Sequence, residues 1–272
     1  MSGATLLGFL VLLRARGVRA ERQGGSWPSA SLLFAYALAF SLAYVQLSAG
    51  TGALLLFGAV QLTMLIGGMR AGSRPTGVDL AGLALALAGL LTLTLPGART
   101  APPLLAAFGM IVAGVAWGFY SLRGRKETRP ALVVTGRNFT RAASIVLLAL
   151  SAAVAAGVPL HAEPRGLALA AISGALTSGL GYVLWYAALP NLDALRAGLV
   201  QLAVPVLTAL GGIAFLDEPL TLRLVTATAL VLAGIAVVVV RRAPAAAHAG
   251  PSVEVPVEVP GEVPVDASGR VG

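Results

Sequence analysis

The chain has 272 residues, of which 57% are hydrophobic and only 11% charged, and its formal net charge at pH 7 is +8. Its mean hydropathy of +0.88 excludes a soluble globular protein, whose surface needs far more charge, and predicts an all-α polytopic membrane protein. The absence of cysteine excludes a disulfide framework, a thiolate metal site and a cysteine nucleophile.

The first apolar segment, residues 1–13, is shorter than the roughly 20 residues needed to cross a bilayer. A signal peptide is the alternative interpretation, but no positive charge precedes this segment and no small-residue cleavage site follows it. The next residues, 14–28, contain four arginines with glycine, serine and proline. They predict a solvated loop after a partial first span.

Eight further apolar segments approach or exceed the length that crosses a bilayer. Connectors such as residues 48–52 and 190–193 are too short to cross a membrane, so neighbouring spans must be antiparallel. With the partial first segment, this gives about nine transmembrane segments. The eight full spans are expected at residues 29–47, 51–69, 78–95, 104–122, 132–157, 167–189, 194–215 and 221–240.

The arginines predict the orientation of these spans. If Arg241 and Arg242 lie in the cytoplasm, alternation places most of the other arginines there too, and the opposite side receives only Arg99, Arg165 and Arg223. This asymmetry is typical of multi-pass membrane proteins, and it makes the lipid bilayer, rather than nucleic acid, the partner of the basic residues. His161 is then external. Residues 243–272 are rich in Pro, Glu and Val, and we expect a disordered cytoplasmic tail.

The sequence contains an internal repeat. Short matches recur in the same order, with an offset between copies that drifts only from 142 to 145 residues. Such a period in a polytopic chain indicates a duplicated transporter unit, with repeats over residues 1–96 and 104–242. The matches are Leu42-Ala43-Tyr44 with Leu184-Trp185-Tyr186, Gly67-Gly68 with Gly211-Gly212, Pro75 with Pro219, and Leu87-Ala88-Gly89 with Leu232-Ala233-Gly234.

Enzymatic motifs are absent from the sequence. It has no HExxH, GxSxG or P-loop pattern, and both histidines, His161 and His248, lie outside the expected spans. Asp79 and Asp193 fall at span ends, where a carboxylate is more simply a helix N-terminal cap. We therefore predict no catalytic residue, no metal site and no cofactor.

Polar residues at depth are the better candidates for a binding site, because polar groups are costly in hydrocarbon and usually face the bundle interior. Gln61 lies near the middle of its span. Gln201 precedes Pro205 by four residues, and a proline cannot donate to the carbonyl of residue 201, so the helix should be loosened there. The alternative is that both glutamines make structural hydrogen bonds between helices.

Aromatic and cationic side chains complete the expected substrate site. Tyr182 and Tyr186 share a helical face with spacing i, i+4, and Trp117 lies deep in its own span. The alternative for these rings is an interfacial aromatic belt or simple packing. Arg137 and Asn138 open a long span and could meet an anionic group from the cytoplasm, unless the arginine only snorkels to the headgroups.

The segment 181–233 carries GYVLWYAAL, then the proline-bearing QLAVPVLTALGG, then LDEPLT and LAG. This assembly resembles the second repeat of EamA-type members of the drug/metabolite transporter superfamily. WGFYSLRGR, which starts at Trp117, similarly resembles the opening helix of that repeat. The resemblance implies ten helices in an inverted five-plus-five repeat, cytoplasmic termini, and alternating-access transport of small metabolites or drug-like molecules, with export as the expected direction.

Two departures accompany the resemblance. The counterpart of the Trp117 helix would lie upstream of Met1, so the first helix of the ten-helix plan is missing from the chain as given, which we attribute to a start codon assigned too far downstream. Gln61 also stands where the second repeat has Pro205. A non-transporting, truncated membrane protein and, less favoured, a membrane-embedded enzyme remain alternatives, and the protein could be a monomer or a homodimer.

Overall fold

The computed structural model describes residues 24–94, 102–158, 163–216 and 219–241, and these residues form helices and short connections without any β-strand. Seven of the described helical segments are long and apolar enough to cross a membrane. The structure thus agrees with an all-helical multi-pass membrane protein. The expected partial span at residues 1–13, His161 and the tail at 243–272 lie outside the described residues.

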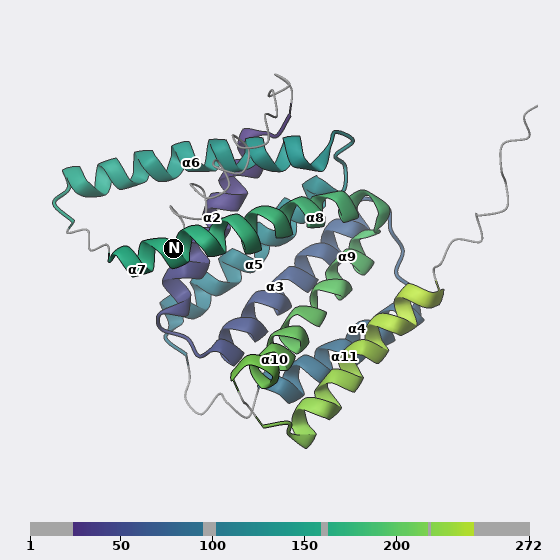
Figure 1. The fold of residues 1–272 in the computed structure, drawn as a ribbon. Helices are drawn as coiled ribbons and strands as arrows, with labels where there is room; N and C mark the ends of the chain where they lie inside the picture. The colour runs from purple at the N-terminus through teal and green to yellow at the C-terminus, as the bar shows by residue number, and fades with distance from the viewer. Residues whose placement is uncertain (1–23, 95–101, 159–162, 217–218, 242–272) are drawn as a thin grey trace, which may run out of the picture. The chain divides into compact units, whose positions relative to one another are not determined.

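The helices follow the chain order shown in Figure 1. Each of the eight full spans expected from the sequence corresponds to one helical segment, although two of these segments change geometry along their length. The segments are α2 (Trp27–Tyr44), α3 (Ala49–Arg70), α4 (Gly77–Thr94), α5 (Leu104–Gly124), α6 (Ala131–Ala155), α7 (Pro164–Ser173) with a π-helical segment (Gly174–Leu180), α8 (Gly181–Ala188) and a 3₁₀ turn (Leu189–Asn191), α9 (Ala194–Gln201) with α10 (Ala203–Leu216), and α11 (Leu222–Arg241).

Side-chain caps determine where several helices begin. Ser26 and Ser48 accept hydrogen bonds from first-turn backbone N–H groups of α2 and α3. Thr76 and Asp79 form a reciprocal pair at the start of α4, in which Asp79 accepts from the Thr76 backbone N–H at 2.7 Å and donates its own N–H to the threonine hydroxyl. Asp193 caps α9 by accepting from the Arg196 N–H at 2.8 Å. These contacts satisfy N–H groups that a helix start leaves without partners.

The span expected at 194–215 is divided between α9 and α10. Helix α9 ends at Gln201 and α10 begins at Ala203, with Leu202 as the C-cap of α9. Pro205 has no N–H to donate to the Gln201 carbonyl, so the helical hydrogen bond at this point is missing. Across this interruption, residues Ala194–Thr208 form an apolar helix that is shorter than the seven long spans.

The central packing unit is formed by α5 against α2 and α3. Helix α3 in turn contacts α9, and it lies between α5 and α9 in Figure 1. Val60 and Met64 of α3, both fully buried, join the core that α2, α5, α6 and α8 surround. Residues far apart in the sequence thus meet around α3 and α5.

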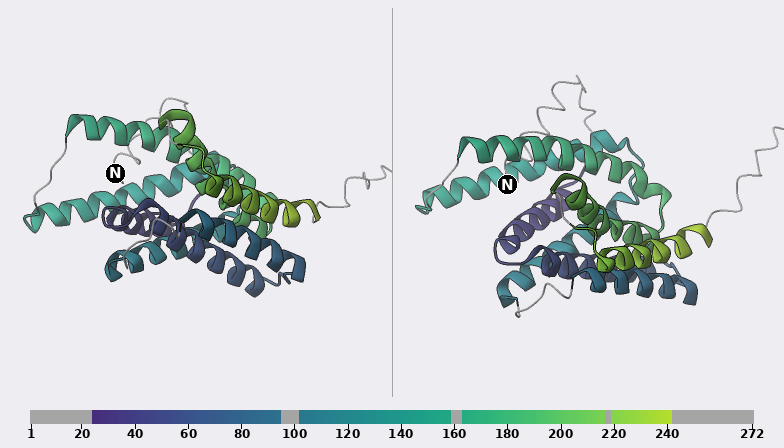
Figure 2. Two further views of the ribbon diagram at one scale, coloured as in Figure 1. Left: turned by 90° about the horizontal axis from the view of Figure 1, so that it is seen from below. Right: turned by 60° about the horizontal axis from the view of Figure 1, so that its bottom comes forward.

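Helices α4 and α11 form the most extensive helix pair in the described chain and run side by side in Figure 2. They are antiparallel, and small residues bring their backbones together. A Cβ on Gly234 would lie 2.5 Å from the Gly82 carbonyl oxygen, and a Cβ on Gly89 would lie 2.8 Å from the Ala227 carbonyl oxygen. In lipid, such close backbone approach replaces the hydrophobic effect as the source of helix association.

Candidate functional site

An aromatic cluster occupies the space between α2, α5, α6 and α8. Trp117 lies near its centre, with ring centroids 4.9 Å from both Tyr36 and Tyr182. The rings are tilted relative to one another, as aromatic pairs prefer. The cluster consists of Tyr36, Trp117, Tyr120, Phe139, Tyr182 and Tyr186.

The cluster has a buried end and a more open end. Tyr120 is 0% exposed and Tyr186 is 3% exposed, and the Tyr186 hydroxyl donates to the Tyr120 carbonyl at 3.1 Å. Tyr36, Trp117 and Tyr182 are half-buried. The i, i+3 spacing of Trp117 and Tyr120 and the i, i+4 spacing of Tyr182 and Tyr186 place each pair on one helical face. These rings therefore face the bundle interior rather than forming an interfacial belt.

Gln201 connects the aromatic cluster to the interrupted helix. Its Oε1 accepts a hydrogen bond from the indole N–H of Trp117, and its Nε2 donates to the Ala197 carbonyl at 2.9 Å. The second bond holds the amide along α9, so the oxygen points toward α5. Gln201 is the last residue of α9 before the helix break, and its side chain therefore links α9 to α5 at this point.

Gln61 also contacts α9, one helical turn before Gln201. Its Nε2 donates to the Gly198 carbonyl at 2.6 Å, and its side chain is buried. A Cβ at Gly198 would lie 2.7 Å from Gln61 Oε1, so α9 needs a glycine where this side chain crosses it. This hydrogen bond joins α3 to α9. It is the kind of structural hydrogen bond between helices that the sequence predicts as the alternative role for Gln61. Whether Gln61 also binds substrate stays a prediction.

Arg137 and Asn138, which belong to α6, lie beside the N-terminal end of α2. Asn138 Oδ1 accepts from the Ser26 backbone N–H at 2.9 Å, and the side chain of Arg137 lies beside Gly24 and Gly25. Arg123, which the sequence interpretation did not select, donates from Nε to Ser29 Oγ at 2.9 Å and from Nη2 to Ser26 Oγ at 3.1 Å.

The structure thus brings the expected site residues into two adjoining groups. Trp117, Gln201, Tyr182 and Tyr186 belong to the aromatic cluster and its link to α9, whereas Asn138 and Arg137 of α6 lie beside the start of α2. Gln61 stands apart from both groups, on α3 against α9. Tyr36 and Arg123 were missed because nothing in the sequence shows which helices face each other. The signal for Tyr120 was present in its spacing from Trp117.

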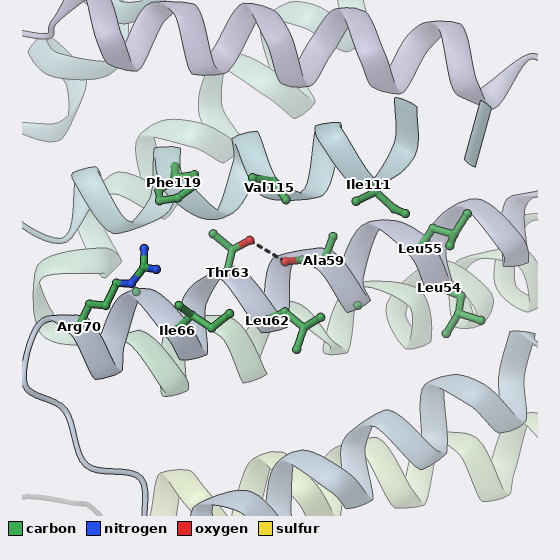
Figure 3. A pocket seen from close by; sticks show the side chains of 12 residues that line it. Leu54, Leu55, Ala59, Leu62, Thr63, Ile66, Arg70, Ile111, Val115 and Phe119 are labelled. Carbon is green, nitrogen blue, oxygen red and sulfur yellow. Dashed lines mark hydrogen bonds between the residues drawn. The ribbon is translucent and has the colours of Figure 1, made fainter. Parts of the chain in front are cut away.

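A separate hollow of about 540 Å³ lies between α3 and α5 (Figure 3), and it contains none of the expected site residues. Its lining is almost wholly apolar, with Arg70 at one end. The hydroxyl of Thr63 in this lining already donates to the Ala59 carbonyl at 2.8 Å. The hollow offers a complementary surface to hydrocarbon rather than to a polar solute.

Charges at the end of α5 form a distinct local network. Burial lowers the pKa of Arg125, while the nearby Asp193 carboxylate acts in the opposite direction, and Arg125 Nε donates to the Leu192 carbonyl at 2.8 Å. In the part of the chain that the structure describes, no group of three or more His, Cys, Asp or Glu side chains is placed to hold a metal ion.

A model of the EamA-like transporter family matches residues 104–240. A protein of Pseudomonas aeruginosa described as uncharacterized is 51% identical over 249 residues, which cover 92% of this chain and 84% of that protein. An uncharacterized transporter of Archaeoglobus fulgidus is 45% identical over 69 residues, 25% of each chain. A solved structure titled only as a crystal structure of a protein is similar in fold, with a TM-score of 0.69, 22% identity, and coverage of 88% of this chain and 85% of that one.

Proposed function

Because the chain belongs to the EamA-like transporter family, we propose that it is a secondary transporter that moves a small metabolite or drug-like molecule across the cytoplasmic membrane. Transport proceeds by alternating access, and the direction is export. The protein is not an enzyme in this proposal. The substrate site is the aromatic cluster together with Gln201.

The hydrogen bond between Trp117 and Gln201 is the observation that carries the proposal. It places a polar amide and a half-buried indole at the point where α9 is interrupted. Small-molecule sites combine apolar and aromatic walls with a few oriented polar groups, and transporter sites lie where membrane helices are discontinuous. Substrate that competes for this amide would separate α5 from α9, and this couples binding to movement.

Contacts between α4 and α11 support an inverted repeat. The sequence repeat relates Gly89 to Gly234 with an offset of 145, and the same offset relates Gly82 to Ala227. Gly82 contacts Gly234, and Gly89 contacts Ala227. If each residue of the first contact is replaced by its counterpart in the other repeat, the result is the second contact. A two-fold axis between matched elements produces this reciprocity. We propose that the repeats are residues 1–96 and 104–242, with the axis passing between α4 and α11.

The proposed orientation places the loop after α5 and residues 243–272 in the cytoplasm, on the basis of the arginine distribution. Because the chain has no cysteine, single introduced cysteines report on topology without background. A cysteine at position 161 should react with an impermeant maleimide from the outside of intact cells. Labelling of that position only in inverted vesicles would show the orientation to be reversed.

An efflux comparison tests the transport function. Cells that produce the wild-type protein, Gln201→Leu, Trp117→Phe or Gln46→Leu are compared by untargeted profiling of small molecules in the medium and in the cells. Gln46 is an exposed glutamine in the turn after α2, and its variant is the matched control. We expect the wild type and Gln46→Leu to export the same compounds and the other two variants to lose this export at equal membrane abundance.

The result then has to be reproduced with purified protein in vesicles. Compounds that pass the cellular comparison are loaded at high concentration on one side, and exchange of labelled compound is measured. If Gln201→Leu and Trp117→Phe exchange as fast as the wild type, the site assignment is wrong. If no compound from the comparison is exchanged by the wild type, the non-transporting alternative is favoured.

A further inference from the structure

We propose that the hydrogen-bond donors around the N-terminal end of α2 bind an oxyanion, a carboxylate or a phosphate, that belongs to the transported molecule. The inference rests on the proposed transport function and narrows its substrate class to organic anions with an apolar or aromatic body. The body would lie along the aromatic cluster, and the anionic group would lie among Arg123, Arg141 and the backbone at Ser26.

Two arginines in this region carry charges that the described residues do not neutralise. Among the described residues, Arg123 donates only to the hydroxyls of Ser26 and Ser29. Arg141 donates from Nη1 to the Gly24 carbonyl at 2.9 Å, and its guanidinium lies 5.9 Å from the centroid of the Trp27 ring. Both ion pairs of the described chain involve other arginines. A guanidinium has five N–H donors and matches the two oxygens of a carboxylate or phosphate. Both arginines therefore retain donors for an oxyanion.

The backbone around Ser26 adds positive potential. Ser26 is the N-cap of α2, and helix N-termini favour anions through their dipole and their free N–H groups. Gly25 has a positive φ of 59°, and a Cβ there would lie 2.9 Å from Arg141 Nη1 and 2.7 Å from Asn138 Oδ1. Position 25 therefore requires glycine, because its backbone has a positive φ and because Arg141 and Asn138 pack directly against it.

Two buried polar groups provide independent evidence for a missing acceptor. Tyr120 and Asn138 are both 0% exposed, yet the Tyr120 hydroxyl and Asn138 Nδ2 have no hydrogen-bond partner among the residues that the structure describes. Leaving a buried donor without an acceptor costs about 1–3 kcal/mol, so such groups in a native structure need an explanation. Both can donate, and an oxyanion supplies the acceptors.

Asn138 and Tyr120 connect the end of α2 to the aromatic cluster, of which Tyr120 is a member. Asn138 Oδ1 is held by the Ser26 N–H, which fixes the amide at the end of α2, and the Tyr120 hydroxyl lies close to Asn138 and Tyr186. Tyr120 stacks beside Trp117 with a centroid distance of 5.7 Å. Because both groups are fully buried, the proposal requires that α2 separate from α6 for an anion to reach them, which would break the Ser26–Asn138 hydrogen bond.

Ligand binding to the full-length protein tests the inference. The protein is placed in nanodiscs of zwitterionic phosphatidylcholine, and binding of benzoate, phenyl phosphate and the neutral isostere benzamide is measured by calorimetry and by thermal stabilisation. The variants are Arg123→Gln and Arg141→Gln. Arg70→Gln is the matched control, because Arg70 is an exposed arginine on α3, outside the proposed site.

We expect saturable binding of both anions, no binding of benzamide, and affinities weakened about tenfold or more in Arg123→Gln and Arg141→Gln. Arg70→Gln should bind like the wild type. Equal weakening in Arg70→Gln would show a general effect of net charge and overturn the site, as would equal binding of benzamide and benzoate. If a Gln variant does not fold, Arg123→Lys and Arg141→Lys replace it, since they keep the charge and lose the planar pair of donors.

Two further arms identify the source of the oxyanion. If phosphatidylglycerol in the nanodiscs displaces benzoate, the site binds a lipid phosphate, and the substrate assignment is overturned. Glu21 precedes α2 in the sequence and lies outside the described residues. If benzoate binds only after Glu21→Gln, a carboxylate of the chain itself competes for the site, with the same consequence. Loss of export in Gln201→Leu without any anion binding by the wild type would leave the transport function standing and refute only this inference.

Discussion

Replacing Gly234 by alanine should separate α4 from α11. The new Cβ would lie 2.5 Å from the Gly82 carbonyl oxygen and 2.7 Å from the Ala86 nitrogen, both backbone atoms that cannot rotate away. Ordinary contact of a Cβ begins at 3.4 Å, so the helices must move apart by about 1 Å in a well-packed contact. Overpacking of this kind costs about 1–3 kcal/mol, and we expect the upper part of that range.

Alanine also has a higher helix propensity than glycine, by up to about 1 kcal/mol. We therefore expect a net loss of about 2 kcal/mol in the free energy of unfolding for Gly234→Ala. Gly181→Ala in α8 is the matched control, because no atom lies within 4 Å of a Cβ at that position. The difference of about 3 kcal/mol between the two variants is the packing term.

Equilibrium unfolding by SDS in mixed micelles, followed by circular dichroism, measures both variants against the wild type. The reasoning would be refuted if Gly234→Ala were as stable as Gly181→Ala, because the backbone contact would then not constrain the helix pair.

The same unfolding assay checks three smaller effects. Tyr186→Phe removes the hydroxyl that donates to the Tyr120 carbonyl and should cost about 0.5–1.5 kcal/mol; an unchanged transition would contradict this. Asp193→Ala removes the N-cap of α9 and should cost about 1 kcal/mol, whereas equal stability would mean that water replaces the cap. The hydrogen bond from Arg129 lowers the pKa of Glu127, so the pair stabilises the fold above the unfolded-state pKa of the carboxyl, and this is lost as pH falls through the lowered pKa. The effect should be small because Arg129 is exposed to solvent, and Glu127→Gln should remove it from the stability-versus-pH profile.

Local chemistry explains why the spans were predictable from the sequence. Apolar length and short polar connectors identify a membrane helix without knowledge of its neighbours, and all eight full spans correspond to helical segments in the structure. The break after Gln201 follows from Pro205, which acts on its own helix. The π-helical segment at Gly174–Leu180 contains no proline and gave no comparable signal.

The composition of the candidate site was predicted only in part, because it depends on which helices meet. Spacing shows that Tyr182 and Tyr186 share a face, but it cannot show that this face meets Tyr36 of α2 or Trp117 of α5. Gln61 was recognised as a polar group at depth, yet its partner, the Gly198 carbonyl, is a backbone atom with no sequence signature. Arg123 was not selected as a site residue, although its guanidinium reaches the start of α2.

The pairing of α4 with α11 has a consequence for biosynthesis. During translation α4 enters the membrane early, whereas α11 is the last described helix to leave the ribosome. Until then the glycine face of α4, with Gly82 and Gly89, lacks the backbone surface that it later contacts. The nascent chain therefore holds an incompletely packed helix until synthesis is nearly complete, and contacts between distant segments form late in folding. A chain that terminates before α11 leaves α4 without its partner. The unpaired glycine face of α4 is then a feature by which membrane quality control can recognise a truncated chain.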